Sequence, residues 1–269
     1  MTIRALSTAA TGMIAQQLHV DVLANNLANV NTIGYKKSRA NFQDLIYQSL
    51  QRSGTSLSAD QDQKRPSGVQ IGLGVRESSV QKIHTQGPLV NSGLQTDIAI
   101  DGEGFFQIKV LDNQAPNGVG YTRAGAFTID SNGQLVTPNG YLLEPPITVP
   151  ENTVAINVSI DGTVEAVQQN VATATQVGTI QLATFRNPGG LHAIGDSLLT
   201  ETDSSGAAQT QTPGQAGTGI LRQGFLEQSN VQVVQELVEL IQAQRAYEVN
   251  ANSIESADEM LKTANNLRR

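Results

Sequence analysis

The two ends of the chain carry long helical patterns of hydrophobic residues. The C-terminal segment 227–269 contains neither glycine nor proline, the residues that most often interrupt a helix. Apolar residues recur there every seven positions, as in a coiled-coil seam: Val233, Leu240, Tyr247, Ile254 and Leu261, with Leu237 and Ala251 at the four-residue offset. The same offset also holds Gln244, Asp258 and Asn265, so the seam is imperfect. A helix of about 40 residues is roughly 60 Å long, and this length favours a partner along it.

The N-terminal segment 1–34 has a matching pattern. Its seam positions follow a regular 3-4 spacing: Ile3, Leu6, Ala10, Met13, Gln17, Val20, Ala24, Leu27 and Asn31. Gly34 stands where a residue that tolerates positive φ would end a helix. Only Arg4 and Asp21 carry charge before Gly34, so we expect the neutral faces to be buried against other copies of the chain. A simple helical hairpin in a globular protein is the alternative.

The middle of the chain has the composition of a β domain. All prolines lie between Pro66 and Pro213, and three hairpin dipeptides separate short apolar runs: Asn132-Gly133, Asn139-Gly140 and Asp161-Gly162. The sequence therefore predicts an α+β protein, in which residues 1–34 and 227–269 form a coiled-coil-like helical pair and residues 94–203 form an inserted antiparallel β domain. Residues 35–93 and 204–226 are predicted to connect them. Within the first connection, residues 69–75 resemble a strand with 79–84 as its partner, and polar residues 53–67 resemble a loop or arm.

Three local features near the predicted helix ends have simple interpretations. The basic cluster 35–39 suits a solvated helix C-terminus, where cations complement the helix dipole. Ser229 or Asn230 is a suitable cap for the second helix. Four asparagines are unusual within a helix: Asn25, Asn26, Asn29 and Asn31. They either hydrogen-bond across subunits or fray the helix end.

The composition gives little reason to expect catalysis, a cofactor or a metal. The chain of 269 residues has no cysteine and a net charge of −7, which excludes disulfides and thiol chemistry and argues against nucleic-acid binding. No metal-binding or hydrolase motif surrounds the histidines His19, His84 and His192. Asp101 and Glu103 flank Gly102 and are interpreted as turn residues rather than paired catalytic carboxylates. No apolar run reaches the length of a membrane span, and no cleavable signal-peptide pattern is expected at the N-terminus.

Several segments together resemble the bacterial flagellar rod and hook protein family. The segment 23–37 (LANNLANVNTIGYKK) is similar to its N-terminal signature, and 238–250 (VELIQAQRAYEVN) is similar to its terminal motif. Segments 101–106 and 121–127 match its middle region. The chain length, with segments 40–48 and 69–76, favours a distal rod subunit over a proximal rod or hook subunit.

This resemblance implies a structural, non-enzymatic subunit that assembles helically with itself into the hollow drive shaft carrying torque from motor to hook. The terminal helices would form the inner layer around a channel, and a 46–75 arm would reach along neighbours. Expected partners are proximal rod proteins and the hook protein end to end, the periplasmic and outer-membrane rings, and the flagellar type III export apparatus. Neither nucleic-acid binding nor membrane insertion is expected. The rod would lie in the basal body and cross the periplasm.

The expected self-assembly residues come from the two seams and from the two terminal motifs: Ile3, Leu6, Met13, Val20, Asn25, Asn26, Leu27, Asn29, Asn31, Gly34, Tyr35, Val233, Leu237, Leu240, Arg245, Tyr247, Ile254 and Leu261. A proximal rod or hook subunit is the alternative within the family. An alternative of another class is a coiled-coil adhesin or binding module with a β head, which predicts a closed oligomer rather than an open polymer.

Overall fold

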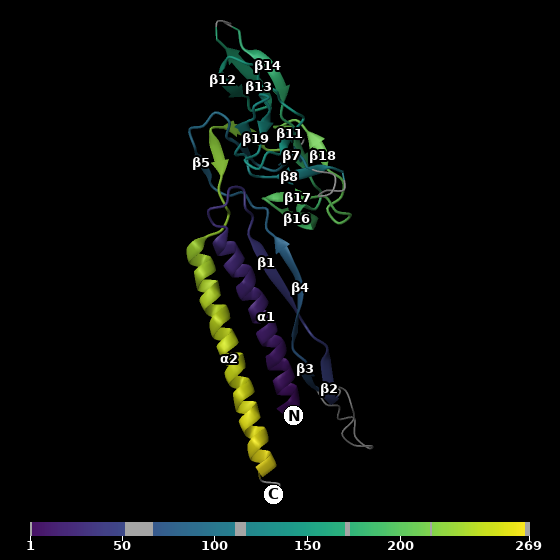
Figure 1. Cartoon of the computed structure of the whole chain (residues 1–269). Coiled ribbons are helices and arrows are strands. Elements are labelled where there is room, and N and C mark those ends of the chain that lie inside the picture. Colours follow the sequence, from purple (N-terminus) through teal and green to yellow (C-terminus); the bar gives the residue numbers. More distant parts are fainter. Residues whose placement is uncertain (1, 52–66, 111–116, 170–172, 216, 267–269) are drawn as a thin grey trace, which may run out of the picture. The chain divides into compact units, whose positions relative to one another are not determined.

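The computed structural model of the protein describes residues 2–51, 67–110, 117–169, 173–215 and 217–266 (Figure 1). The chain divides into two compact units, each built from segments that are distant in sequence. The first unit comprises Met1–Leu27, Ser38–Gln81 and Val233–Arg269, and the second comprises Ala28–Lys37 and Lys82–Gln232. Most of the polar stretch 53–67 lies outside the described residues.

The first unit contains both helices, α1 (Thr2–Ala28) and α2 (Val233–Asn266). They lie side by side in Figure 1, and they run antiparallel because Gly12 faces Asn250 while Asn26 contacts Glu236. Both helices are shorter than predicted. A hydrogen-bonded turn, in which the amide of Thr32 donates to the carbonyl of Asn29, follows α1 before Gly34 is reached, and a strand occupies 225–227 ahead of α2.

Four strands accompany the helices as a two-stranded ribbon: β1 (Ser38–Asp44), β2 (Tyr47–Gln51), β3 (Val69–Gly72) and β4 (Val75–Lys82). β2 pairs with β3, and β1 pairs with β4. The predicted pairing of 69–75 with 79–84 is therefore wrong. The chain does not reverse between β3 and β4, since the amide of Leu45 donates to the carbonyl of Gly74 at 2.8 Å and joins the two ladders into one ribbon.

The second unit contains the remaining strands in several antiparallel sheets. Its elements, in chain order, are β5 (Leu89–Asn91), β6 (Ile98–Asp101), β7 (Phe105–Lys109), β8 (Val119–Thr122), β9 (Thr128–Ile129), β10 (Leu135–Val136), β11 (Leu142–Glu144), β12 (Thr153–Val158), β13 (Thr163–Gln168), β14 (Thr175–Thr179), β15 (Leu182–Thr184), the 3₁₀ helix η1 (Pro188–Gly190), β16 (His192–Gly195), β17 (Leu198–Thr200), β18 (Gln209–Gln211), β19 (Ile220–Gln223) and β20 (Phe225–Glu227).

The sheets of the second unit mix local hairpins with long-range pairs. The largest sheet has the order β16-β17-β8-β7-β11-β10-β9, with β15 pairing with β7 and β18. A separate sheet has the order β12-β13-β14. The predicted turns are confirmed, because the Asn-Gly and Asp-Gly dipeptides lie in the β9–β10, β10–β11 and β12–β13 connections. The long-range pairs β6–β19 and β5–β20 bring residues 220–227 into this unit.

The core of the second unit consists of aromatic and aliphatic side chains from these sheets. Phe106 and Phe127 are fully buried and meet edge to face, with ring centroids 5.2 Å apart. Ile98, Ile100 and Leu221 pack in the same cluster, so the β6–β19 pair is fixed by side chains as well as by its ladder. Burying such large apolar side chains contributes roughly 1.5–3 kcal/mol each. This core supplies the framework on which the linker residues 28–37 and 228–232 are held.

Candidate self-assembly site

Asn26 connects three elements of the first unit. Its side chain is 1% exposed, and its amide nitrogen donates to the carbonyl of Ser38 at 2.8 Å and to a carboxylate oxygen of Glu236 at 3.1 Å. Its amide oxygen accepts from the backbone nitrogen of Ser38 at 2.8 Å. Glu236 itself lies in the first turn of α2, where a carboxylate complements the helix dipole. The amide of Asn26 is therefore engaged within the chain, where it ties the end of α1 to β1 and to α2.

The inward face of α2 is a row of small and polar residues rather than large apolar ones. Glu236, Ala243 and Ala257 are buried, and Asn250 completes the seven-residue spacing. Asn250 approaches α1 so closely that a Cβ atom added to Gly12 would lie 2.9 Å from its amide nitrogen. Small residues at the contact allow the two helices to approach each other.

The predicted seam residues of α2 consequently lie to one side of this row. Leu240, Ile254 and Leu261 are half-buried, as is Ala251, whereas Val233, Leu237 and Tyr247 are 40%, 40% and 43% exposed. Arg245 is exposed. The sequence pattern pointed to the apolar positions, but the inward row carries Glu236 and two alanines, which give no hydrophobic signal.

The predicted positions of α1 are also mainly half-buried. This group comprises Leu6, Ala10, Met13, Val20 and Leu27, while Gln17, Ala24, Asn25 and Asn31 are exposed and Asn29 is half-buried. The side chain of Ile3 lies outside the described residues. Among the side chains of this helix that the structure describes, the buried apolar ones are Ala15, Val22 and Leu23. Most predicted seam residues thus keep part of their apolar surface in reach of another molecule.

An apolar patch lies on the face of α2 opposite to its inward row. Val234 is 76% exposed, Val238 and Ile241 are each 48% exposed, and Leu237 completes the patch. Their spacing of i, i+3, i+4 and i+7 places them on one side of a helix that turns about 100° per residue. We name these four residues the α2 outer patch.

Two predicted residues meet at an open groove between the helices. Val20 of α1 and Tyr247 of α2 line a groove of about 400 Å³, together with Gln17, Gln244 and Glu248. The groove is lined by two residues with apolar surface and three polar ones, and its size suits side chains of a neighbouring molecule. Within this groove, one residue of each predicted seam lines the same surface.

The motif residues that follow α1 belong to the second unit. Gly34 has φ +68°, its amide donates to the carbonyl of Glu227 at 2.8 Å, and an added Cβ would lie 2.6 Å from the amide nitrogen of Ala124. Only glycine fits this conformation and this space. The ammonium nitrogen of Lys82 lies 5.4 Å from the ring centroid of Tyr35, a distance typical of a cation–π contact.

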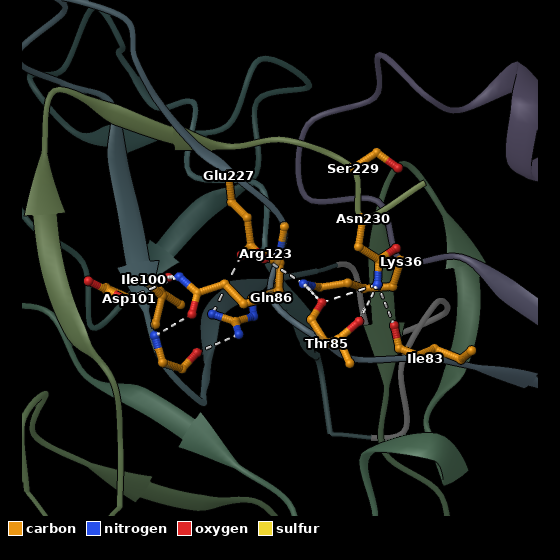
Figure 2. A network of polar contacts seen from close by, with 12 residues as sticks. Lys36, Ile83, Thr85, Gln86, Ile100, Asp101, Arg123, Glu227, Ser229 and Asn230 are labelled. Carbon is orange, nitrogen blue, oxygen red and sulfur yellow. Dashed lines mark hydrogen bonds and ion pairs between the residues drawn. The ribbon is translucent and has the colours of Figure 1, made fainter. Parts of the chain in front are cut away.

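Lys36 corrects the interpretation of the basic cluster as wholly solvated. Its side chain is 3% exposed, and its ammonium contacts a carboxylate oxygen of Glu227 at 2.5 Å (Figure 2). Burial lowers the pKa of Lys36 from its ordinary value, and the attraction of Glu227 opposes this shift. The expected cap residue Asn230 is also used elsewhere, since its amide oxygen accepts from the backbone of Lys37 at 2.8 Å. The sequence provides little indication of the Lys36–Glu227 and Lys37–Asn230 contacts, because the residues of each pair are 191 and 193 positions apart.

The described residues offer little support for other kinds of site. Neither described helix is both long enough and apolar enough to cross a membrane. Within the described ranges no three histidine, aspartate or glutamate side chains gather as metal ligands. The carboxylate of Asp101 forms an ion pair with Arg222 at 2.7 Å.

Comparison with known proteins defines the class to which the chain belongs. Three family models match it in order: "Flagella basal body rod protein" over residues 6–36, "Flagellar hook protein FlgE/F/G D1 domain" over 99–166, and "Flagellar basal body rod FlgEFG protein C-terminal" over 222–267. These matches include most of α1, the centre of the β-rich unit and all of α2. Together with the full-length relatives below, they show that the chain belongs to the flagellar rod and hook protein family.

The full-length relatives narrow this family to its rod members. The chain is 47% identical to the flagellar basal-body rod protein FlgG of Caulobacter vibrioides, over 98% of this chain and 99% of that protein. It is 47% identical to FlgG of Borreliella burgdorferi over 99% of each chain, and 45% identical to FlgG of Buchnera aphidicola over 96% of each. The flagellar hook protein FlgE of Treponema pallidum is 42% identical, over 50% of this chain and 27% of its own length. The protein is a structural, non-enzymatic subunit of the flagellar basal-body rod.

Proposed function

We propose that the protein is a distal rod subunit that polymerises through its terminal helices into a hollow, open-ended drive shaft. The observation that carries this proposal is the α2 outer patch, which exposes four apolar side chains on a helix whose opposite face is already packed. Contiguous exposed apolar residues on one face indicate a protein interface. A second copy is the partner we favour, because a heterologous contact repeated around an axis builds a helical polymer.

The groove lined by Val20 and Tyr247 supports the same assignment. It lies in the unit that contains both helices, and its half-exposed apolar residues offer a receptor for side chains of a neighbour. The proposal extends to the finer partners: proximal rod proteins and the hook protein at the two ends, the surrounding rings, and the type III export apparatus. The 46–75 arm is proposed to reach along neighbouring subunits, and its described residues Ile46, Tyr47 and Ile71 are exposed.

The α2 outer patch is tested by introducing a charge into it. We expect Val238→Asp to abolish polymerisation of the purified protein, because a carboxylate buried without a counter-ion at an apolar interface is strongly unfavourable. The measurement is sedimentation and electron microscopy of polymers, with circular dichroism of the β-rich unit to verify folding. Leu240→Asp is also expected to abolish polymerisation, because Leu240 belongs to the predicted apolar seam of α2.

A matched control lies on the same side of the same helix. Asn252 is exposed in a polar part of α2, so Asn252→Asp should leave polymerisation unchanged. Normal polymers from Val238→Asp would contradict the proposed interface, and a discrete closed oligomer of the wild-type chain would favour a binding module instead. Complementation of strains that lack single rod or hook components tests the distal position in the rod.

A further inference from the structure

The segments that lead to the two terminal helices converge on one buried carboxylate. Residues 34–37 follow α1, residues 227–230 precede α2, and residues 83–88 lie between β4 and β5. Figure 2 shows the contacts of Lys36 with Glu227 and those of Asn230 with Ile83 and Thr85. All three belong to the second unit, so their contacts are internal to that unit.

Glu227 is held by two hydrogen bonds and by one longer ion pair. One carboxylate oxygen accepts from the ammonium of Lys36 and from the backbone amide of Gly87 at 2.9 Å. The other oxygen lies 3.6 Å from a guanidinium nitrogen of Arg123, which is anchored by its second nitrogen to the carbonyl of Gly102 at 2.6 Å. Lys36 also donates to the carbonyl of Thr85 at 2.8 Å. We name Lys36, Thr85, Gly87, Arg123 and Glu227 the Glu227 cluster.

Asn230 repeats the same connections with neutral groups. Its amide nitrogen donates to the carbonyls of Ile83 and Thr85, at 2.9 and 3.1 Å, while its amide oxygen accepts from Lys37. The backbone adds a direct link, in which the amide of Ile83 donates to the carbonyl of Lys37 at 2.9 Å. Each of the three segments is therefore bonded to both of the others.

The backbone approaches too closely for any segment to dock out of place. A Cβ atom at Gly87 would lie 2.0 Å from the carbonyl oxygen of Gln228, and one at Gly34 would meet the backbone at Arg123 and Ala124. Gly87 and Gly34 allow the chain to pass at these distances. The segments around the cluster are therefore closely packed through their backbones as well as joined by polar side chains.

The charges make docking of one segment depend on the others. The side chains of Lys36, Arg123 and Glu227 are 3%, 5% and 1% exposed, so each ion would be left buried without compensation if a partner moved away. Removing one member of a buried ion pair is far more destabilising than removing an exposed pair. If 34–37 is displaced, Glu227 loses Lys36; if 227–230 is displaced, Lys36 and Arg123 both lose their carboxylate.

We infer that Glu227 is a positioning residue whose carboxylate makes the linkers to the two terminal helices dock together or not at all. Its action is on residues 34–37 and 83–88, through Lys36 and Gly87. Residues 34–37 and 227–230 are then ordered together, or lose their order together, within the second unit. This inference is independent of polymerisation, because it concerns the chain before it meets another copy.

Hydrogen exchange of the full-length, unassembled chain tests this coupling. In Glu227→Gln, which keeps the shape but removes the charge, we expect exchange to rise about tenfold or more at 34–37, 83–88 and 228–230 together. Exchange in β7 should stay at the wild-type rate, because the apolar core is untouched. A general loss of stability would instead raise exchange in β7 as well.

Two further variants separate electrostatic coupling from loss of packing. Lys36→Met with Glu227→Gln leaves Arg123 alone, and so restores the net buried charge of the wild-type cluster. We therefore expect this double variant to exchange more slowly than Glu227→Gln. Lys36→Met alone should raise exchange at 83–88 and 228–230, although the substitution lies in another segment. It serves as the informative variant if Glu227→Gln does not fold.

An exposed ion pair elsewhere in the chain provides the control. Lys262→Gln removes the contact between Lys262 and Asp258, whose side chains are 71% and 54% exposed, and it should leave exchange at the three segments unchanged. The inference is overturned if Glu227→Gln or Lys36→Met affects a single segment only or none. It is also overturned if the double variant exchanges as fast as Glu227→Gln.

Discussion

At the scale of single residues, both ring nitrogens of His84 are buried in the second unit without a hydrogen-bond partner. Burial lowers the pKa of His84 to about 4, and the nearby charges of Lys36, Lys82 and Arg123 shift it in the same direction. The carbonyl of Pro188 opposes this shift, although its geometry falls short of a hydrogen bond to either ring nitrogen. Glu103 lines the same small cavity, of about 60 Å³. The imidazole is therefore held neutral against the edge of Phe105.

This neutral histidine predicts that the second unit loses stability in mild acid. The folded pKa of His84, about 4, lies below its unfolded value of 6.5, so the unfolded chain binds more protons between these values. Stability is then complete above pH 6.5 and falls as the pH is lowered toward 4, by up to about 3 kcal/mol. Urea unfolding at a series of pH values measures this loss.

Two histidine substitutions show whether the loss belongs to His84. We expect His84→Gln to flatten the pH dependence between 6.5 and 4, whereas His192→Gln should keep the wild-type slope because His192 is exposed. An unchanged slope in His84→Gln would assign the effect to other groups.

At the scale of elements, α2 shows why packing differs from the sequence pattern. Hydrophobic periodicity correctly located two terminal helices and the strand-rich middle. The Asn-Gly and Asp-Gly dipeptides predicted the turns because these residues tolerate the positive φ that tight hairpin turns require. The inward row of α2 was missed because Glu236, Ala243 and Asn250 are acidic, small and amide side chains. Such residues are buried when a hydrogen-bond partner or a glycine lies opposite, as Asn26 does for Glu236 and Gly12 does for Asn250. The spacing of residues within α2 does not reveal those partners.

The small residues of this row predict a sharp response to added volume. Ala243 is 3% exposed, so Ala243→Leu should destabilise the helical unit by roughly 1–3 kcal/mol, because the new side chain has no space. Thermal unfolding followed by the helical circular dichroism signal measures this change. Gln242→Leu, at the exposed neighbouring position, is the control and should unfold as the wild type does; equal stability of both variants would contradict close packing at Ala243.

At the scale of the whole molecule, the two units differ in how they are held together. The second unit has a continuous apolar core around Phe106 and Ile100. The first unit leaves large apolar side chains of α2 and of the ribbon exposed, among them Val234, Ile46 and Val80. Such an arrangement gives low resistance to local opening in the first unit. The sequence could not indicate which distant segments pair, as β5 does with β20 and Lys36 with Glu227. Strand register and ion pairing between residues so far apart leave no local pattern in the sequence.

Limited proteolysis before and after polymerisation tests this difference. In the unassembled chain we expect cleavage within the helices and the ribbon, while a fragment containing β6 to β17 resists. In polymers the helices should become protected, because neighbours cover the α2 outer patch. Mass spectrometry of the fragments identifies the cut sites. Helices that already resist cleavage in the unassembled chain would contradict this expectation.

The contact between Asn26 and Glu236 joins residues 210 positions apart, and it imposes an order on folding. Hairpins such as β9–β10 close over a few residues and form quickly, whereas closing so long a loop carries a larger entropic penalty and a slower search. The N-terminal helix cannot complete its buried contacts until the last part of the chain is present. The helical unit is therefore the last part of the protein to mature, and a chain lacking either end leaves the other without its partner.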